Sequence, residues 1–205
     1  GERSTFAYLD GYGTSTETTL KEFFNLGNAK VAIESDMGEK SSLVYANNKA
    51  KALLDADLTI DKGNANASTI ALLATNQSSV TVDSGKTLTT NTNVGLIATK
   101  GAALSGAVSE AKNSGTIVSN RTDKGIGIYA DAAKGNNIGT ITMSNQNAVG
   151  MLGVLGSSLI NTGKIGLGGV SSAGMYGEDS DLTNSTTTSE INVNKKESAG
   201  MYAKA

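Results

Sequence analysis

The sequence predicts an all-β fold, a right-handed parallel β-helix of about seven to eight coils with about 24 residues in each coil. Two short motifs recur along the chain at this interval, and both are rich in β-branched or aromatic residues. Gly, Asn, Asp and Ser surround the motifs, as is typical of short strands bounded by turns. The 205 residues include no proline, which fits strands whose N–H groups must all pair with the next coil.

The first motif follows the pattern Asn-x-Gly-x-Ile. Copies start at Asn113, Asn137 and Asn161, and a shortened copy starts at Ser189. Weaker matches lie upstream at Val31-x-Ile33, Leu58-x-Ile60 and Val80-x-Val82. Strand alternation directs one residue column inward (Ile117, Ile141, Ile165, Ile191) and a second with it (Met143, Leu167, Val193, with Ser119 as the exception). We expect the Asn side chains to bond to turn backbone or to stack on their copies, and Gly115, Gly139 and Gly163 to take positive φ angles.

The second motif begins about ten residues after each Ile of the first. One of its columns is apolar in every copy and is predicted to point inward (Val44, Leu72, Leu96, Ile128, Met151, Met175, Met201). The small residues two positions later are also predicted to point inward (Ala46, Ala74, Ala98, Ala130, Gly153, Gly177, Ala203). Alternation directs the column between them outward, although it is also apolar or aromatic throughout (Tyr45, Leu73, Ile97, Tyr129, Leu152, Tyr176, Tyr202).

Two places interrupt the period. Tyr8 and Val44, taken as successive inward residues, are 36 residues apart, and the surplus predicts a short amphipathic helix over residues 14–27. Thr14 and Glu17 have capping-box spacing, and Gly27 suits the end of a helix. A second surplus predicts an inserted loop over residues 99–112. Residues 1–205 are therefore expected to form one β-helix segment, and because the chain stops partway through a coil, we expect it to belong to a longer protein.

Composition limits the possible functions. The chain has no cysteine and no histidine, which excludes disulfide scaffolds, thiol nucleophiles, Cys/His zinc sites and Ser-His-Asp triads. A net charge of −2 provides no basic surface for nucleic acid. No apolar run approaches the roughly 18 residues of a membrane span, so we expect this segment to lie outside the membrane. We expect no metal and no cofactor.

Carboxylates are the remaining candidates for catalysis. A glycan-cleaving β-helix needs two carboxyl groups about 5–9.5 Å apart, which on stacked coils means equivalent positions in adjacent coils. The most acidic column reads Thr99, Asp131, Val154, Glu178 and Lys204, and it contains no such adjacent pair. We therefore expect no enzyme, and a glycan-active β-helix enzyme is the third-ranked function.

Four segments of the repeats stand out: Gly125-Ile-Gly-Ile-Tyr-Ala130, Asn113-Ser-Gly-Thr-Ile117, Ser172-Ala-Gly-Met-Tyr-Gly177 and Ser198-Ala-Gly-Met-Tyr-Ala-Lys204. These segments resemble the passenger repeats of large fusobacterial type V autotransporter adhesins. The resemblance covers residues 68–205 well and 29–67 loosely, and residues 14–27 match nothing in that family. The resemblance implies a secreted passenger with a right-handed β-helix, displayed on the outer membrane, that binds proteins or glycans of host cells or other bacteria.

Two functions lead from these observations. The first is an adhesin segment, monomeric or weakly associating, and the second is a purely structural stalk. Tyr129, Tyr176 and Tyr202 are the candidate partner-binding residues, because tyrosine combines a rigid apolar ring with a polar tip. The open alternative is that the outward column is covered, by the inserted helix or loop or by a neighbouring rod, or is stacked on itself.

Overall fold

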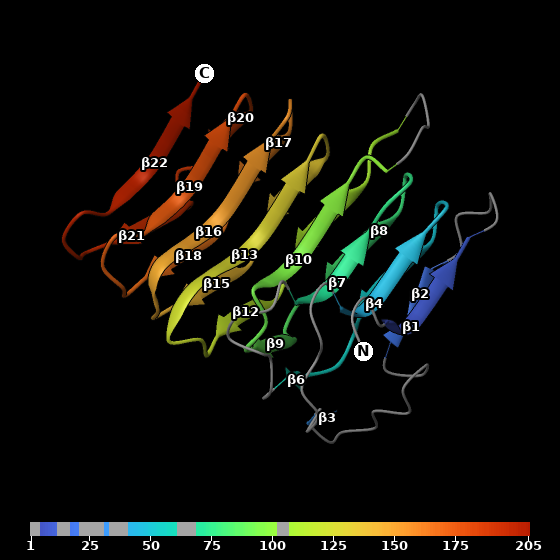
Figure 1. Cartoon of the computed structure of the whole chain (residues 1–205). Coiled ribbons are helices and arrows are strands. Elements are labelled where there is room, and N and C mark those ends of the chain that lie inside the picture. The colour runs from blue at the N-terminus through green and yellow to red at the C-terminus, as the bar shows by residue number, and fades with distance from the viewer. Residues whose placement is uncertain (1–4, 12–16, 21–30, 33–40, 61–68, 102–106) are drawn as a thin grey trace.

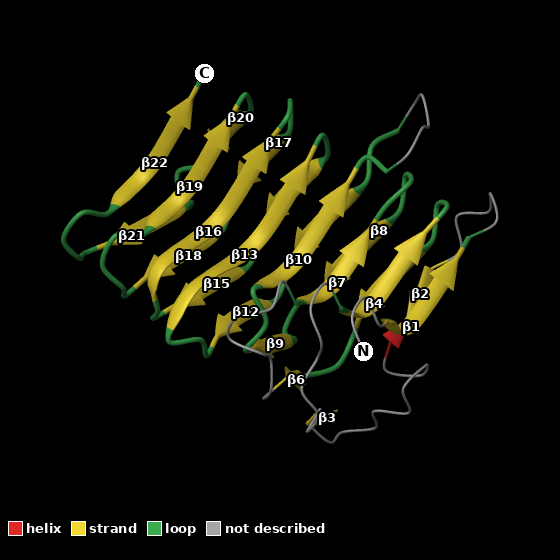
Figure 2. Cartoon of the chain, viewed as in Figure 1, coloured by secondary structure: helices red, strands yellow, loops and turns green. Residues whose placement is uncertain are grey.

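The computed structural model is a right-handed parallel β-helix built from three sheets, and it describes residues 5–11, 17–20, 31–32, 41–60, 69–101 and 107–205. Each coil contributes one strand to each sheet in turn, so every strand pairs in parallel with the equivalent strand of the next coil. Figure 2 shows the strands of the three sheets wound around one axis, with N- and C-terminal coils at opposite ends. No helix among the described residues is long and apolar enough to cross a membrane.

Sheet A is the eight-stranded sheet, whose strands cross the front of Figure 1. Its strands are β1 (Thr5–Asp10), β4 (Ser42–Asn47), β7 (Ile70–Ala74), β10 (Val94–Thr99), β13 (Asp123–Asp131), β16 (Gln146–Val154), β19 (Ala173–Glu178) and β22 (Ala199–Lys204). The predicted second motif forms this sheet. The inward columns predicted for this motif are confirmed. In the column of large residues, Val44, Leu72, Leu96, Ile128, Met151 and Met175 are fully buried, whereas Met201 in the last strand, β22, is 44% exposed.

Sheet C contains the predicted first motif. Its seven strands are β3 (Val31–Ala32), β6 (Leu58–Ile60), β9 (Thr87–Thr90), β12 (Thr116–Ser119), β15 (Thr140–Met143), β18 (Lys164–Leu167) and β21 (Glu190–Val193). Ile117, Ile141 and Ile165 are buried one above another and Ile191 is half-buried, which confirms this inward column.

Sheet B lies between sheets A and C in each coil and has no counterpart in the predicted pair of motifs. Its strands are β2 (Glu17–Thr19), β5 (Lys51–Leu54), β8 (Ser79–Val82), β11 (Glu110–Asn113), β14 (Lys134–Asn137), β17 (Ser158–Asn161) and β20 (Asp181–Asn184). Val80 and Val82, assigned to the first motif from the sequence, belong to this sheet and pair with Ala111 and Asn113. That assignment is wrong because Val-x-Val fits an inward-facing strand of either sheet; Leu88 is the sheet C residue of this coil.

The two predicted insertions have different outcomes. The helix over residues 14–27 is wrong for residues 17–19, which form β2 and pair with Lys51–Leu53. Leu20 is helical and fully buried, and residues 14–16 and 21–27 lie outside the described residues. In the second region, Thr99 ends β10 and Glu110–Lys112 belong to β11, so the connection spans residues 100–109. Residues 102–106 of it lie outside the described residues.

Tyr8 does not point inward as the sequence analysis expected. Ala7 pairs with Val44 and is buried, whereas Tyr8 pairs with Tyr45 and is 52% exposed. The expectation is therefore wrong by one residue. An aromatic residue in a strand is usually expected to be buried in the core. Here the small Ala7 occupies the interior, and the ring of Tyr8 extends the outward column.

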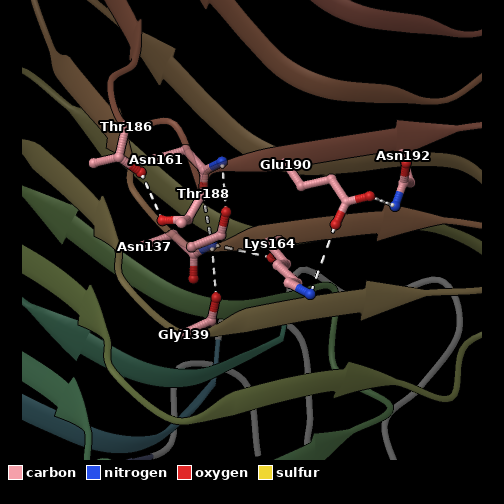
Figure 3. Close-up of polar contacts among 9 residues, drawn as sticks. Asn137, Gly139, Asn161, Lys164, Thr186, Thr188, Glu190 and Asn192 are labelled. Carbon is pink, nitrogen blue, oxygen red and sulfur yellow. Dashed lines mark hydrogen bonds and ion pairs between the residues drawn. The ribbon is translucent and has the colours of Figure 1, made fainter.

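A buried asparagine ladder connects the coils where sheet B turns into sheet C. The Nδ2 atom of Asn113 donates to Oδ1 of Asn137 at 2.8 Å, Asn137 donates to Asn161 at 2.7 Å, and Asn161 donates to Asn184 at 2.7 Å. Figure 3 shows the middle step together with the bonds from Asn137 to the carbonyls of Gly139 and Lys164. The expectation that these side chains bond to turn backbone and to their copies is confirmed.

The glycines of the Asn-x-Gly turns have a different role from the one expected. The φ angles of Gly115, Gly139 and Gly163 are not positive, so that expectation is wrong. A Cβ atom on Gly139 would collide with the carbonyl oxygen of Gly115, and one on Gly163 would collide with that of Gly139. Those carbonyls accept hydrogen bonds of 2.8 Å from the N–H groups of Thr140 and Lys164. Close stacking of the turns therefore requires glycine here.

The buried isoleucine column predicts a sharp contrast within β15. Ile141 is fully buried between Ile117 and Ile165, and the adjacent Thr142 points outward. Ile141→Val should reduce the free energy of unfolding by about 0.5–1.5 kcal/mol, and Ile141→Asp by at least about 3 kcal/mol because it buries an unpaired charge. Thr142→Asp is the control and should change little. Urea unfolding measures all three, and similar losses for Ile141→Asp and Thr142→Asp would contradict the face assignment.

The asparagine ladder predicts a loss of stability that comes from missing hydrogen bonds and not from a side chain that fits poorly. Val82 occupies the ladder position one coil before Asn113, so the column accommodates valine. Asn137→Val removes both ladder bonds of residue 137 and leaves Oδ1 of Asn161 without its ladder donor. An orphaned buried polar group costs about 1–3 kcal/mol, and the unfolding free energy should fall by that amount. Thermal unfolding at equal or higher temperature than wild type would show that the ladder contributes no net stability.

Candidate binding surface

An unbroken column of apolar and aromatic side chains runs along the outer face of sheet A. We call it the outward ladder. Strand register aligns its members one above another: Tyr8, Tyr45, Leu73, Ile97, Tyr129, Leu152, Tyr176 and Tyr202. The alignment predicted from Tyr45 onward is correct, and Tyr8 adds one member at the start. The structure thus places Tyr129, Tyr176 and Tyr202 in one column.

Exposure varies along the ladder. Tyr8 and Tyr202 are 52% and 50% exposed, Ile97 is 8% exposed, and Tyr129, Leu152 and Tyr176 are half-buried. Contacts with neighbouring side chains therefore shield this column from solvent only in part. Single exposed apolar residues are normal on a protein surface, whereas a contiguous apolar column such as this one is a candidate contact surface.

Part of the ladder stacks on itself. The rings of Tyr176 and Tyr202 lie 5.3 Å apart with an interplanar angle of 18°, and those of Tyr8 and Tyr45 meet edge to face at 5.2 Å. Tyr129 has aliphatic neighbours, Ile97 in the preceding coil and Leu152 in the next. The three candidate tyrosines are thus not equivalent, because two share a ring contact and the third is separated from them by Leu152.

A second outward apolar column, which the sequence analysis missed, runs parallel to the ladder three residues earlier in each strand. It consists of Ile70, Val94, Ile126, Val149, Ala173 and Ala199, and the polar residues Thr5 and Ser42 precede these in the first two coils. Simple alternation places Ile126 with the inward Ile128, but the strand bends at Gly127, where a Cβ would lie only 2.9 Å from Cγ2 of the buried Ile141. Residues 127 and 128 therefore both face the core, and Ile126 faces outward.

A polar column borders the ladder on its other side, at the end of the sheet A strands. The predicted neighbours Thr99, Asp131, Val154, Glu178 and Lys204 do align in adjacent coils, and Asn47 and Thr75 precede them. The tyrosine hydroxyls bond to this column: Tyr8 donates to Asp10 at 2.9 Å, and the hydroxyl of Tyr45 accepts from Thr75 at 3.1 Å. The ladder thus has one polar edge and one apolar edge.

Charged side chains of this polar column lie close to the tyrosines of the ladder. Burial and the nearby Asp131 carboxylate raise the pKa of Tyr129 above its ordinary value. Further along the same column, Nζ of Lys204 lies 2.8 Å from Oε1 of Glu178, and this bond raises the pKa of the lysine. The hydroxyl of Tyr129 is neutral at physiological pH, as that of an ordinary tyrosine is, and it lies near the Asp131 carboxylate.

Among the residues that the structure describes, the column with Asp131 and Glu178 contains no carboxyl pair in adjacent coils of the kind a glycosidase needs. Val154 separates Asp131 from Glu178, and Glu178 is bonded to a lysine. Asp55 and Asp83 follow the paired residues Leu54 and Val82 in adjacent coils, but Asp83 accepts the N–H of Ser84 in its own turn at 2.8 Å. Within the described part of the chain, no three acidic, histidine or cysteine side chains are grouped so as to hold a metal ion.

Comparisons with protein-family models, curated proteins and solved structures give no match for this chain. The expected relationship to fusobacterial autotransporter adhesins therefore stays a prediction that rests on the repeat motifs, such as Ser172-Ala-Gly-Met-Tyr-Gly177.

Proposed function

We propose that this chain is a passenger segment of a cell-surface adhesin, displayed on the outer membrane by an autotransporter, and that it attaches through the outer face of sheet A. The observation that supports the proposal is the outward ladder, which carries apolar or aromatic side chains at all eight register positions of that face. A protein that only needed to be long would gain stability from stacked rings such as Tyr176 and Tyr202, but it would have no requirement for apolar side chains at every position of the column.

The geometry of the rod suits attachment rather than catalysis. A parallel β-helix holds equivalent side chains about 4.8 Å apart along its axis, so a contact surface can extend over many coils without any loop movement. No enclosed cleft is needed for this function, and the contact energy is distributed along the ladder. We accordingly propose that the chain is not an enzyme.

A purely structural stalk is the second candidate, and the asparagine ladder favours it. Asn113, Asn137, Asn161 and Asn184 reinforce the joint between sheets B and C in four successive coils, as a rigid spacer requires. The two functions differ in what the outer face of sheet A contributes, because a stalk needs its rigidity and an adhesin needs its side chains.

Replacing three tyrosines separates these functions. The variant Tyr129→Ser/Tyr176→Ser/Tyr202→Ser should weaken attachment of the purified chain to host or bacterial cells by at least about tenfold, because aromatic side chains dominate most protein contacts. It should also lose about 0.5–1.5 kcal/mol of stability through the Tyr176–Tyr202 stacking, so attachment is measured well below the melting temperature.

The matched control removes apolar surface elsewhere. Val118→Ser/Ile138→Ser/Ile160→Ser acts on sheet C, the turn after sheet B, and sheet B, where these side chains are partly or largely exposed. It should attach like wild type. If the tyrosine variant attaches as well as this control while both remain folded by circular dichroism, the outer face of sheet A is not the binding surface and the stalk is favoured.

A further inference from the structure

We propose that the partner of the outer face of sheet A is a protein surface on which basic side chains surround an exposed apolar one. This inference rests on the proposed function and specifies the chemistry of the receptor. It follows from three features of the face around β16: an apolar band across the ladder, an acidic rim beside it, and tyrosine rings that pack on their neighbours in the ladder.

The apolar band consists of the outward residues of the coil that contains β16. Val149, Leu152 and Val154 are half-buried on the outer face, and Leu155, directly after the strand, is 66% exposed. Leu155 also has a φ of 55°, a conformation that costs a non-glycine residue about 1–2 kcal/mol. The apolar surface around the ladder is therefore widest at this coil, because apolar side chains continue past the end of the strand to Leu155.

The acidic rim consists of Asp131, Glu178 and Asp179. Asp131 and Glu178 are the register neighbours of Val154 in the coils before and after it, so they flank the end of the apolar band. Glu178 and Asp179 are exposed. Glu178 forms an ion pair with Nζ of Lys204, and the backbone N–H of Asp179 donates to the carbonyl of Lys204. An apolar centre bounded by carboxylates complements an apolar side chain bounded by lysine or arginine.

The tyrosine rings disfavour a glycan as the partner. Sugar rings stack on exposed aromatic faces, but the facing surfaces of Tyr176 and Tyr202 cover each other at 5.3 Å. The ring of Tyr129 lies in register between Ile97 and Leu152. Edges and hydroxyls are what such stacked rings present outward, and these suit an uneven protein surface.

The test uses attachment of the fluorescently labelled chain to epithelial cells and to a second bacterial species. Cells are used untreated, after trypsin, which removes surface protein, or after periodate, which oxidises the diols of glycans. Trypsin should abolish attachment and periodate should leave it within about twofold. Because charged rims act mainly on association rates, raising the salt concentration should slow association.

Charge variants test the rim directly. Asp131→Lys/Glu178→Lys should reduce attachment by about tenfold or more at physiological salt, and Asp131→Asn/Glu178→Gln, which adds no charge beside Lys204, by a smaller factor. The matched control is Glu110→Lys/Glu190→Lys on sheets B and C. Glu190 resembles Glu178 in pairing with a lysine, Lys164 at 3.7 Å (Figure 3). The exposure of the two glutamate side chains is also similar, 46% for Glu190 and 48% for Glu178.

The outcomes separate the inference from the proposed function. If periodate abolishes attachment, or if both rim variants attach like the control, the inference is overturned, while loss of attachment in the tyrosine variant would still support adhesion through this face. If sedimentation velocity shows dimers that the tyrosine variant loses, the partner is a second copy and the inference is again overturned. Failure of the tyrosine variant to weaken attachment rejects the proposed function itself.

Discussion

Parallel pairing between successive coils is the constraint on which the rest of this structure depends. Because each strand bonds to its own equivalent about 4.8 Å away, every residue type is stacked on its counterparts along the axis. Stacking like on like is favourable for isoleucine, for tyrosine rings and for asparagine amides, which donate and accept at once. It is unfavourable for like charges, and Glu178 and Glu190 accordingly face Lys204 and Lys164 in the neighbouring coil.

The same constraint explains why a binding surface can arise on this fold without a pocket. A single substitution repeated in each coil becomes a continuous column, and the outward ladder is such a column on sheet A. Variation within the column then creates local differences. Leu152 interrupts the tyrosines, and Val154 interrupts the acidic residues Asp131 and Glu178, so one coil differs in chemistry from its neighbours while its backbone is unchanged.

Much of this architecture could be predicted from the sequence because the strongest patterns lie in the strands that face the core. The columns that contain Ile141 and Met151 repeat without exception, and the residue after Met151 repeats as well. Sheet B was missed because two of its middle strands, Glu110–Asn113 and Lys134–Asn137, contain no large apolar residue and owe their place to backbone pairing and the asparagine ladder. Simple alternation failed at Gly127 because the strand bends there. Arg121 could not be predicted either, because no equivalent arginine recurs in the other coils; it is 8% exposed, and its Nε donates to the carbonyls of Asp123 and Lys124.

Footprinting of the cell-bound chain tests most directly whether the outer face of sheet A is the contact surface. Hydroxyl radicals oxidise exposed side chains, and mass spectrometry reports each site with and without cells. Attachment through this face predicts protection of Tyr129, Leu152, Leu155 and Tyr176, with Ile138 and Ile160 oxidised equally in both states. Protection of Ile138 and Ile160 instead, or unchanged oxidation of all these residues in the bound chain, would contradict the proposed binding surface.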